Sequence, residues 1–211
     1  MKRLTLVPLL ALASLSPAFS GTGSLSYGIH GNYASINVPE PLKSAYASGF
    51  GGGLHFDIDL KLATIRLNGD YVSFGADHGV YAELLYSSAQ ADNPDMVISA
   101  SDIAVDGGRI SLLTFGVNAK FNIHNVKVSP YGILGAGTAT INIADLSVSY
   151  QGAPISIQTD FTNQTKFMAS VGAGIDFSLG AIALFVEARQ AWIFTGGETS
   201  SYIPLTLGVT F

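Results

Sequence analysis

Eight stretches of alternating apolar and polar residues constrain the fold of this chain more than any other feature. In the stretch SLLTFGVNAKFNI, Leu113, Phe115 and Val117 share one face, whereas Thr114 and Asn118 share the other. Side chains of a β-strand point to alternate faces, so a period of two predicts a strand. The pattern predicts eight strands: 24–36, 49–60, 64–74, 111–123, 128–143, 166–179, 182–192 and 201–211. In the Gly-rich stretch 128–143, it does not fix which face points where.

The connections between these strands are alternately short and long. The tight ones are 60–63, 124–127 and 178–181, and the long ones are 39–48, 75–109, 144–164 and 195–201. Bacterial barrels have an even number of strands, short turns at the periplasmic rim and longer loops outside. We therefore predict an all-β fold, an eight-stranded antiparallel up-and-down transmembrane β-barrel. A ten-stranded variant, with two further strands from 79–105, stays open but is less favoured by the irregular alternation there.

The low charge of the chain favours a membrane barrel over a soluble one. Only 12% of residues are charged, about half the share of an average soluble domain. The polar strand faces carry charges of both signs: Asp57, Asp59, Asp70, Asp176 and Glu187 against Arg66, Lys120, Lys166 and Arg189. This near balance indicates residues that neutralise one another in a confined lumen, while the apolar faces meet lipid.

The N-terminus has the features of a secretory signal peptide. Lys2 and Arg3 precede an apolar run to about Leu15, and the small residues Ala18 and Ser20 lie at the expected cleavage point. This run is too short to span a bilayer of about 30 Å. We expect residues 1–20 to be cleaved after Ser20, and residues 21–211 to form the mature barrel domain.

Net charge and cysteine usage exclude other classes. Without Lys2 and Arg3 the chain has 8 basic and 15 acidic residues, a formal charge of −7, so we expect no nucleic-acid partner. The sequence contains no cysteine. An exported chain of this kind must be stable without disulfides and cannot form a thiolate metal site.

The chain resembles a known family over residues 21–211. The signal peptide, the alternating strands and the stretches SPYGILGAG (129–137), FVEARQAW (185–192) and IPLTLGVTF (203–211) look like the eight-stranded outer-membrane barrels of the opacity-protein and OmpA-like group. No single motif is specific, but the ordered set is. The resemblance implies a bacterial outer-membrane location. Related chains often carry a periplasmic peptidoglycan-binding domain after the barrel, and we expect none here.

The resemblance also assigns a role to the last strand. In that family a C-terminal strand that ends in Phe, with apolar residues at alternate positions, is the signal read by the outer-membrane assembly machinery. That implies an assembly signal made of Ile203, Leu205, Leu207, Val209 and Phe211. The simpler interpretation, an interface aromatic at Phe211, is compatible with it.

We expect a polar network in the lumen. If residues 61 and 62 form the turn, Asp57 lies opposite Arg66 on the adjacent strand. The expected network consists of Asp57, Arg66, Asp70, Lys120, Glu187 and Arg189. We interpret it as a plug that stabilises the barrel; the alternative is a narrow pore that opens when the ion pairs exchange partners.

The two longest connections are expected to fold. Residues 79–89 fit a short amphipathic helix, and the D-G-G sequence within 102–113 is a hairpin signal. Residues 146–150 and 155–161 suggest a second hairpin that extends strands 128–143 and 166–179 as a protruding ribbon. Its edges would either capture a partner strand or shield the lumen. The acidic residues of 75–108 match no calcium loop, so we expect a solvated surface.

Catalysis has weak support. A lipid-modifying barrel needs a His paired with Ser or Asp near the outer rim, and only His78, with Asp77 and Ser73, has that position. His30, His55 and His124 are scattered, so we expect no metal site, no cofactor and no catalytic residues. We expect a monomeric structural or surface-interaction (adhesion-like) protein. Its expected partners are outer-membrane lipid and lipopolysaccharide, the assembly machinery and a surface protein.

Overall fold

The structure is a computed structural model that describes residues 24–38, 44–60, 62–92, 99–123, 127–151, 153–155, 163–196 and 199–211. The expected signal peptide and His124 lie outside the described residues. Among the described residues, no helix is long and apolar enough to cross a membrane.

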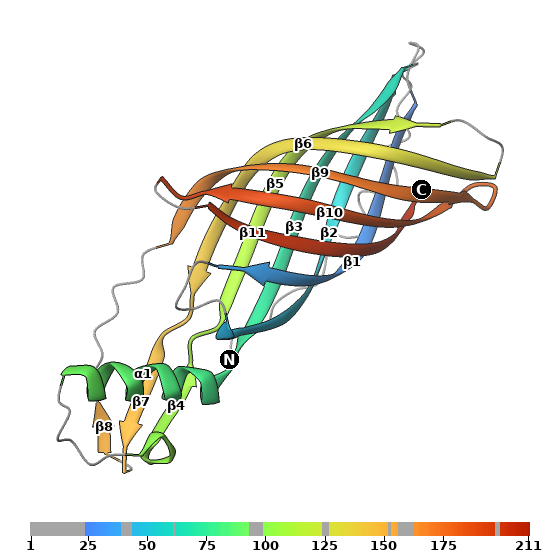
Figure 1. Cartoon of the computed structure of the whole chain (residues 1–211). Coiled ribbons are helices and arrows are strands. Elements are labelled where there is room, and N and C mark those ends of the chain that lie inside the picture. The colour runs from blue at the N-terminus through green and yellow to red at the C-terminus, as the bar shows by residue number, and fades with distance from the viewer. Residues whose placement is uncertain are drawn as a thin grey trace, which may run out of the picture.

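Eight antiparallel strands form a closed barrel (Figure 1). They are β1 (Leu25–Asn37), β2 (Tyr46–Leu60), β3 (Ala63–Ala76), β5 (Ile110–Asn122), β6 (Val128–Ile143), β9 (Gln164–Ser178), β10 (Ala183–Phe194) and β11 (Thr199–Thr210). Each strand pairs with its neighbour along the chain, and β11 pairs with β1 to close the wall. The predicted eight-stranded barrel is confirmed. The ten-stranded alternative is wrong, because residues 78–92 form a helix and the strand that follows does not join the wall.

The outer face of the barrel is apolar, as the alternation predicts. Large apolar side chains such as Ile29, Leu54 and Leu205 are about half exposed. Aromatic pairs lie on this face near both ends of the barrel: Tyr27–Phe211 at the end with tight turns, and Tyr33–Phe50 and Phe167–Phe194 at the end with long loops. This arrangement is typical of the two aromatic girdles of transmembrane barrels.

The lumen is filled by two layers of different chemistry. Toward the tight turns it holds polar and charged side chains, described below. Toward the long loops it holds a layer of buried apolar side chains: Ala34, Val72, Phe74, Ile110, Leu112, Ala139, Met168, Ala191, Ile193 and Tyr202. The sequence pattern predicts only a polar lumen. The difference arises because the inward positions of the strands become apolar in their outer halves, as at Val72 and Phe74.

A small lobe lies beyond the long-loop end of the barrel (Figure 1). Its elements are α1 (His78–Asp92), η3 (Ala100–Asp102), β4 (Ile103–Gly107), β7 (Leu146–Tyr150) and β8 (Ala153–Ile155). The three strands form a sheet in the order β4-β7-β8. The lobe core consists of Ala45, Tyr81, Ala82, Val105 and Val148. The predicted helix over 79–89 is confirmed and extends to His78–Asp92.

The lobe sheet continues the ladder of two barrel strands. Ile110 pairs with Ile143 in the barrel, and Gly107 pairs with Leu146 in the lobe, so β4–β7 keeps the register of β5–β6. Gly107 and Gly108, with φ of 87° and 69°, form the bend between the two parts. These are backbone conformations that glycine adopts without steric cost.

This continuity corrects two expectations about the long connections. The D-G-G sequence does not close a hairpin, because β4 and β5 run on in one direction and pair with different strands. Two glycines at positive φ suit a tight hairpin turn and a bend equally well. The second hairpin is confirmed for β7 and β8, where Tyr150 pairs with Ala153, but β7 also pairs with β4. The protruding ribbon therefore extends β5 and β6, not β6 and β9; residues 156–161 lie outside the described residues.

Candidate functional site

Arg66 of β3 is the best-connected cation in the lumen. It lies opposite Asp57 of β2 in the strand register. Its Nε and one terminal nitrogen each donate a hydrogen bond of 2.8 Å to Asp57, forming a bidentate pair. Its other terminal nitrogen lies 3.5 Å from Glu187, and its guanidinium carbon lies 5.0 Å from the ring centre of Phe185. Because Arg66 and Asp57 are almost wholly buried, neither can exchange its partner for bulk water.

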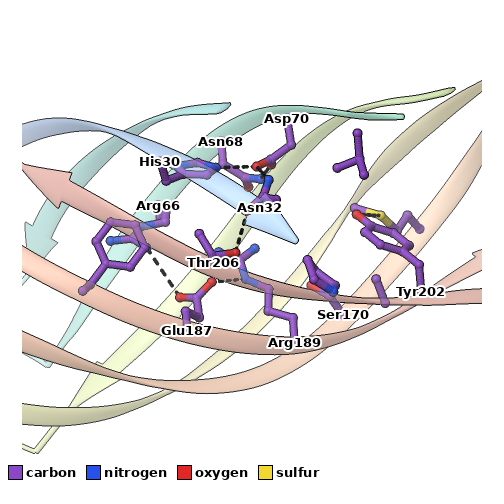
Figure 2. Close-up of a pocket in the computed structure, with 15 residues that line it drawn as sticks. His30, Asn32, Arg66, Asn68, Asp70, Ser170, Glu187, Arg189, Tyr202 and Thr206 are labelled. Atoms are coloured by element: carbon purple, nitrogen blue, oxygen red, sulfur yellow. Dashed lines mark hydrogen bonds and ion pairs between the residues drawn. The ribbon is translucent and has the colours of Figure 1, made fainter. Parts of the chain in front are cut away.

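Glu187 of β10 accepts hydrogen bonds from three side chains, and Figure 2 shows two of these donors, Arg66 and Arg189. Its carboxylate accepts hydrogen bonds from Arg66, Arg189 and the hydroxyl of Tyr131, the last at 2.8 Å. Arg189 also donates to the side-chain oxygen of Asn118 at 3.2 Å. β3, β6 and β10 therefore meet at one buried carboxylate, and Arg189 connects β5 to it.

Lys120 and Asp176 form a separate pair nearer the tight turns. The Lys120 nitrogen lies 2.6 Å from Asp176 and 4.1 Å from the ring centre of Tyr131. Tyr131 thus contacts both Lys120 and Glu187 and connects this pair to the Arg66 group.

Asp70 is the centre of a third group (Figure 2). It accepts hydrogen bonds from Asn32 at 3.1 Å and from Asn68, and it contacts His30 directly. His30 in turn lies 3.4 Å from His55, nitrogen to nitrogen. Asp70 and Lys120, which we expected to share the lumen, both lie in it but have different partners.

The six expected network residues thus all project into the lumen, in three adjoining groups. Several further members of this network are not among the six expected residues: His30, Asn32, His55, Asn68, Asn118, Tyr131 and Asp176. Most of them can be found by assigning every second residue of each strand to the lumen. In β1, for example, His30 and Asn32 alternate with the exposed Ile29 and Tyr33. The partners themselves depend on side-chain length and barrel stagger, which alternation does not report.

The lumen network leaves very little free space. The cavity between His30, Asp70, Glu187, Arg189 and Tyr202 has a volume of about 30 Å³. That is room for only a few water molecules. Toward the long loops, the apolar layer with Phe74 and Leu112 follows directly. Side chains therefore obstruct the lumen at two levels.

The last strand places its apolar residues on the lipid-facing side. Ile203, Leu205, Leu207 and Phe211 are exposed there, and Val209 is partly exposed. Phe211 exchanges two backbone hydrogen bonds with Tyr27, of 2.7 and 3.2 Å. The chain is thus held in the wall up to its final residue.

The residues considered for catalysis have other contacts. His78 lies 3.2 Å from the carbonyl oxygen of Gly107, and Asp77 accepts hydrogen bonds from the backbone of Gly79 and Val80 at the start of α1. Ser73 pairs with Phe50 and Ser111 in the wall. No contact that joins all three is recorded in the described part of the chain. Nor do three or more His, Asp or Glu side chains there surround a possible metal ion.

The sequence matches a known protein family. The model described as "Outer membrane protein beta-barrel domain" matches residues 5–211, almost the whole chain. Among curated proteins, no sequence matches the chain significantly.

Solved structures share the fold at low sequence identity. The crystal structure of Neisserial surface protein A (NspA) superposes with a TM-score of 0.52 at 17% identity, covering 89% of this chain and 97% of NspA. The outer membrane enzyme PagL gives a TM-score of 0.51 at 12% identity, covering 86% of this chain and 97% of PagL. At these identities the likeness extends to the fold alone, because one barrel fold carries unrelated functions.

Proposed function

Because this chain belongs to the outer-membrane protein β-barrel domain family, we propose that it is a sealed membrane anchor that presents a folded lobe for interactions at the cell surface. The proposal has two parts, a lumen that does not conduct and a lobe that faces outward. A cleaved leader of residues 1–20 and outer-membrane insertion through the C-terminal strand belong to the same proposal.

The filled lumen is the observation that carries this proposal. The ion-paired groups around Arg66, Lys120 and Asp70 leave a cavity of about 30 Å³. A hydrated ion passing this level would have to separate buried pairs, which is strongly unfavourable when one partner is left uncompensated. It would then have to cross the apolar layer, in which Tyr202 is the single member with a hydroxyl, so little there replaces its hydration.

The lobe supports the surface role. It has its own buried core and lies at the long-loop end, which faces the outside in bacterial barrels. The hydroxyls of Tyr46 in β2 and Tyr81 in α1 lie 2.6 Å apart and tie the lobe to the barrel wall. A fixed, folded surface is suited to recognition, since fewer conformations are lost on binding.

Labelling of single cysteines on intact cells tests the orientation. The chain has no native cysteine, so Ser88→Cys on the exposed side of α1 and Ser178→Cys at the opposite end of the barrel can be compared directly. A membrane-impermeant maleimide should label Ser88→Cys on intact cells and Ser178→Cys only after the outer membrane is permeabilised. The reverse pattern would refute an outward lobe.

The sequence also allows a narrow pore and a lipid-modifying enzyme, and each makes a different prediction. A narrow pore would need the Arg66 and Arg189 pairs to separate during conduction. The expectation that the chain is not an enzyme rests on the weak His78 grouping, and His78→Ala should then leave the lipid composition of the outer membrane unchanged. A monomeric state in the membrane is likewise proposed.

A further inference from the structure

The lobe sheet has an edge strand beside its helix. In the order β4-β7-β8, β4 pairs with β7 on one side only. α1 crosses the sheet, and its first turns line a groove with β4 (Figure 1). Exposed strand edges present N–H and C=O groups that can pair with another chain. The chemistry of this edge therefore determines what it can bind.

The hydrogen-bond phase of the ladder identifies the groups on the free edge. The N–H of Gln151 donates to the carbonyl of Asp102, and the N–H of Gly108 donates to the carbonyl of Asp145. In an antiparallel ladder these bonds recur at every second residue. The even-numbered residues of β4 thus face β7, and Ile103, Val105 and Gly107 turn their backbone groups to the free edge.

Backbone groups at both ends of this edge already have hydrogen-bond partners. The N–H of Ile103 donates to the carbonyl of Ala100. The N–H of Gly107 donates to the side chain of Asp106, and the Gly107 carbonyl lies 3.2 Å from the ring nitrogen of His78. At the centre, Val105 keeps both its N–H and its C=O on the edge, with no partner recorded for them among the described residues. Val105 therefore offers both of its backbone groups for docking, between Gly107, whose two groups have partners, and Ile103, whose N–H has one.

A groove follows this open point. It has a volume of about 460 Å³ and lies between the first turns of α1 and the edge of β4, with Ala82, Glu83, Ala100 and Val105 among its lining residues. That volume is within the usual range of ligand pockets. Alanines on both walls leave room for the side chains of an added strand.

The negative charge of the lobe favours a basic binding partner. Its acidic residues include Asp77, Glu83, Asp102, Asp106 and Asp145. In the described ranges 77–92, 99–109, 144–151 and 153–155, Arg109 is the only Lys or Arg. A field of one sign favours partners of the opposite sign. Glu83 lines the groove itself, so a basic side chain of an occupant can reach a carboxylate there.

We propose that the groove between α1 and β4 binds an extended basic segment of another protein, which pairs with the backbone of Val105 as an added strand. This inference rests on the proposed surface role of the lobe and specifies its partner. Main-chain hydrogen bonds supply affinity in such strand addition, and flanking side chains supply selectivity.

A fluorescent peptide tests this inference on the full-length protein in detergent micelles. The probe is an amidated peptide that alternates valine with lysine, and anisotropy reports its binding. We expect saturable binding. Methylation of the central peptide nitrogen should lower the affinity about tenfold, because it removes the N–H that pairs with Val105. An analogue with glutamate in place of lysine should bind more weakly still.

Two variants separate the groove from the rest of the lobe. Ala100→Phe fills the groove and should abolish binding, whereas Ala153→Phe makes the same change on β8, outside the groove, and should not affect it. The inference is overturned if the peptide does not bind, if the methylated or acidic peptide binds equally well, or if Ala100→Phe has no effect. If the peptide does not bind, but the protein self-associates and Ala100→Phe abolishes that self-association, the groove binds a second copy of this chain. That result also overturns the inference. None of these outcomes affects the sealed lumen, which conductance tests separately.

Discussion

Arg66 and Asp57 form a bidentate ion pair of two 2.8 Å hydrogen bonds between adjacent strands, buried inside the barrel. Both side chains are excluded from solvent, so each needs the other to neutralise its charge. Replacing both together by apolar residues is expected to change the free energy of unfolding little. Removing one partner is different, because an uncompensated charge stays behind. Several consequences of this arrangement can be measured.

Arg66→Ala should lower the free energy of unfolding by about 3–5 kcal/mol, since it leaves Asp57 and the nearby Glu187 without their shared cation. Urea titration of the refolded protein in lipid bilayers measures this change. Lys127→Ala removes a cation at an exposed tight turn and serves as the matched control. Equal effects of the two substitutions would contradict a structural role for the pair.

The hydrogen bond between Tyr46 and Tyr81 should contribute to docking of the lobe on the barrel. In a double-mutant cycle of Tyr46→Phe and Tyr81→Phe, we expect a coupling energy of about 0.5–1.5 kcal/mol. Hydrogen exchange of the α1 amides measures it. Tyr86→Phe makes the same change on the same helix, and it should show no coupling to Tyr46→Phe.

Gly107→Ala should destabilise the lobe without unfolding the barrel. At φ 87° an alanine is strained by about 1–2 kcal/mol, and its Cβ would also collide with the backbone oxygen of Asp145. Gly196 has a similar φ of 94° but open space around it, so Gly196→Ala isolates the strain alone. Faster hydrogen exchange in β4 and β7 for Gly107→Ala than for Gly196→Ala is expected. Unchanged exchange would show that the bend does not need glycine.

Phe211→Ala should reduce the amount of protein in the outer membrane of cells more than it reduces refolding in vitro. The reason is the role proposed for the last strand in assembly. Phe194→Ala is a close control, because Phe194 is also lipid-facing and is 45% exposed, against 47% for Phe211. Immunoblots of membrane fractions give the comparison. Equal losses from both variants would reduce Phe211 to an interface aromatic.

The barrel could be predicted because each wall position has only two environments, lipid and lumen. Alternation in stretches such as 111–123 therefore reports the fold directly, and the short turn at 60–63 fixes the pairing of Asp57 with Arg66. The apolar layer was missed although its signal is present: Val72 and Phe74 have the inward parity of Arg66 and Asp70. The assumption that every inward-facing residue is polar does not allow for an apolar layer.

The lobe could be predicted only in part. The helix at 78–92 and the β7–β8 turn follow from local signals. The pairing of β4 with β7 does not, because it joins residues about forty positions apart through a bend at Gly107 and Gly108. Local sequence equally allows a hairpin there. The groove beside β4 is a product of that pairing and has no sequence signature.

Single-channel recording in planar bilayers tests the central claim, that the lumen is sealed. Wild type, Arg66→Ala and Arg189→Ala are compared under the same voltage and salt. The account predicts no steady openings in any of the three, because the apolar layer around Phe74 and Leu112 remains intact when an ion pair is lost. Steady openings of the wild type, altered by either substitution, would contradict it and make the lumen a conduit.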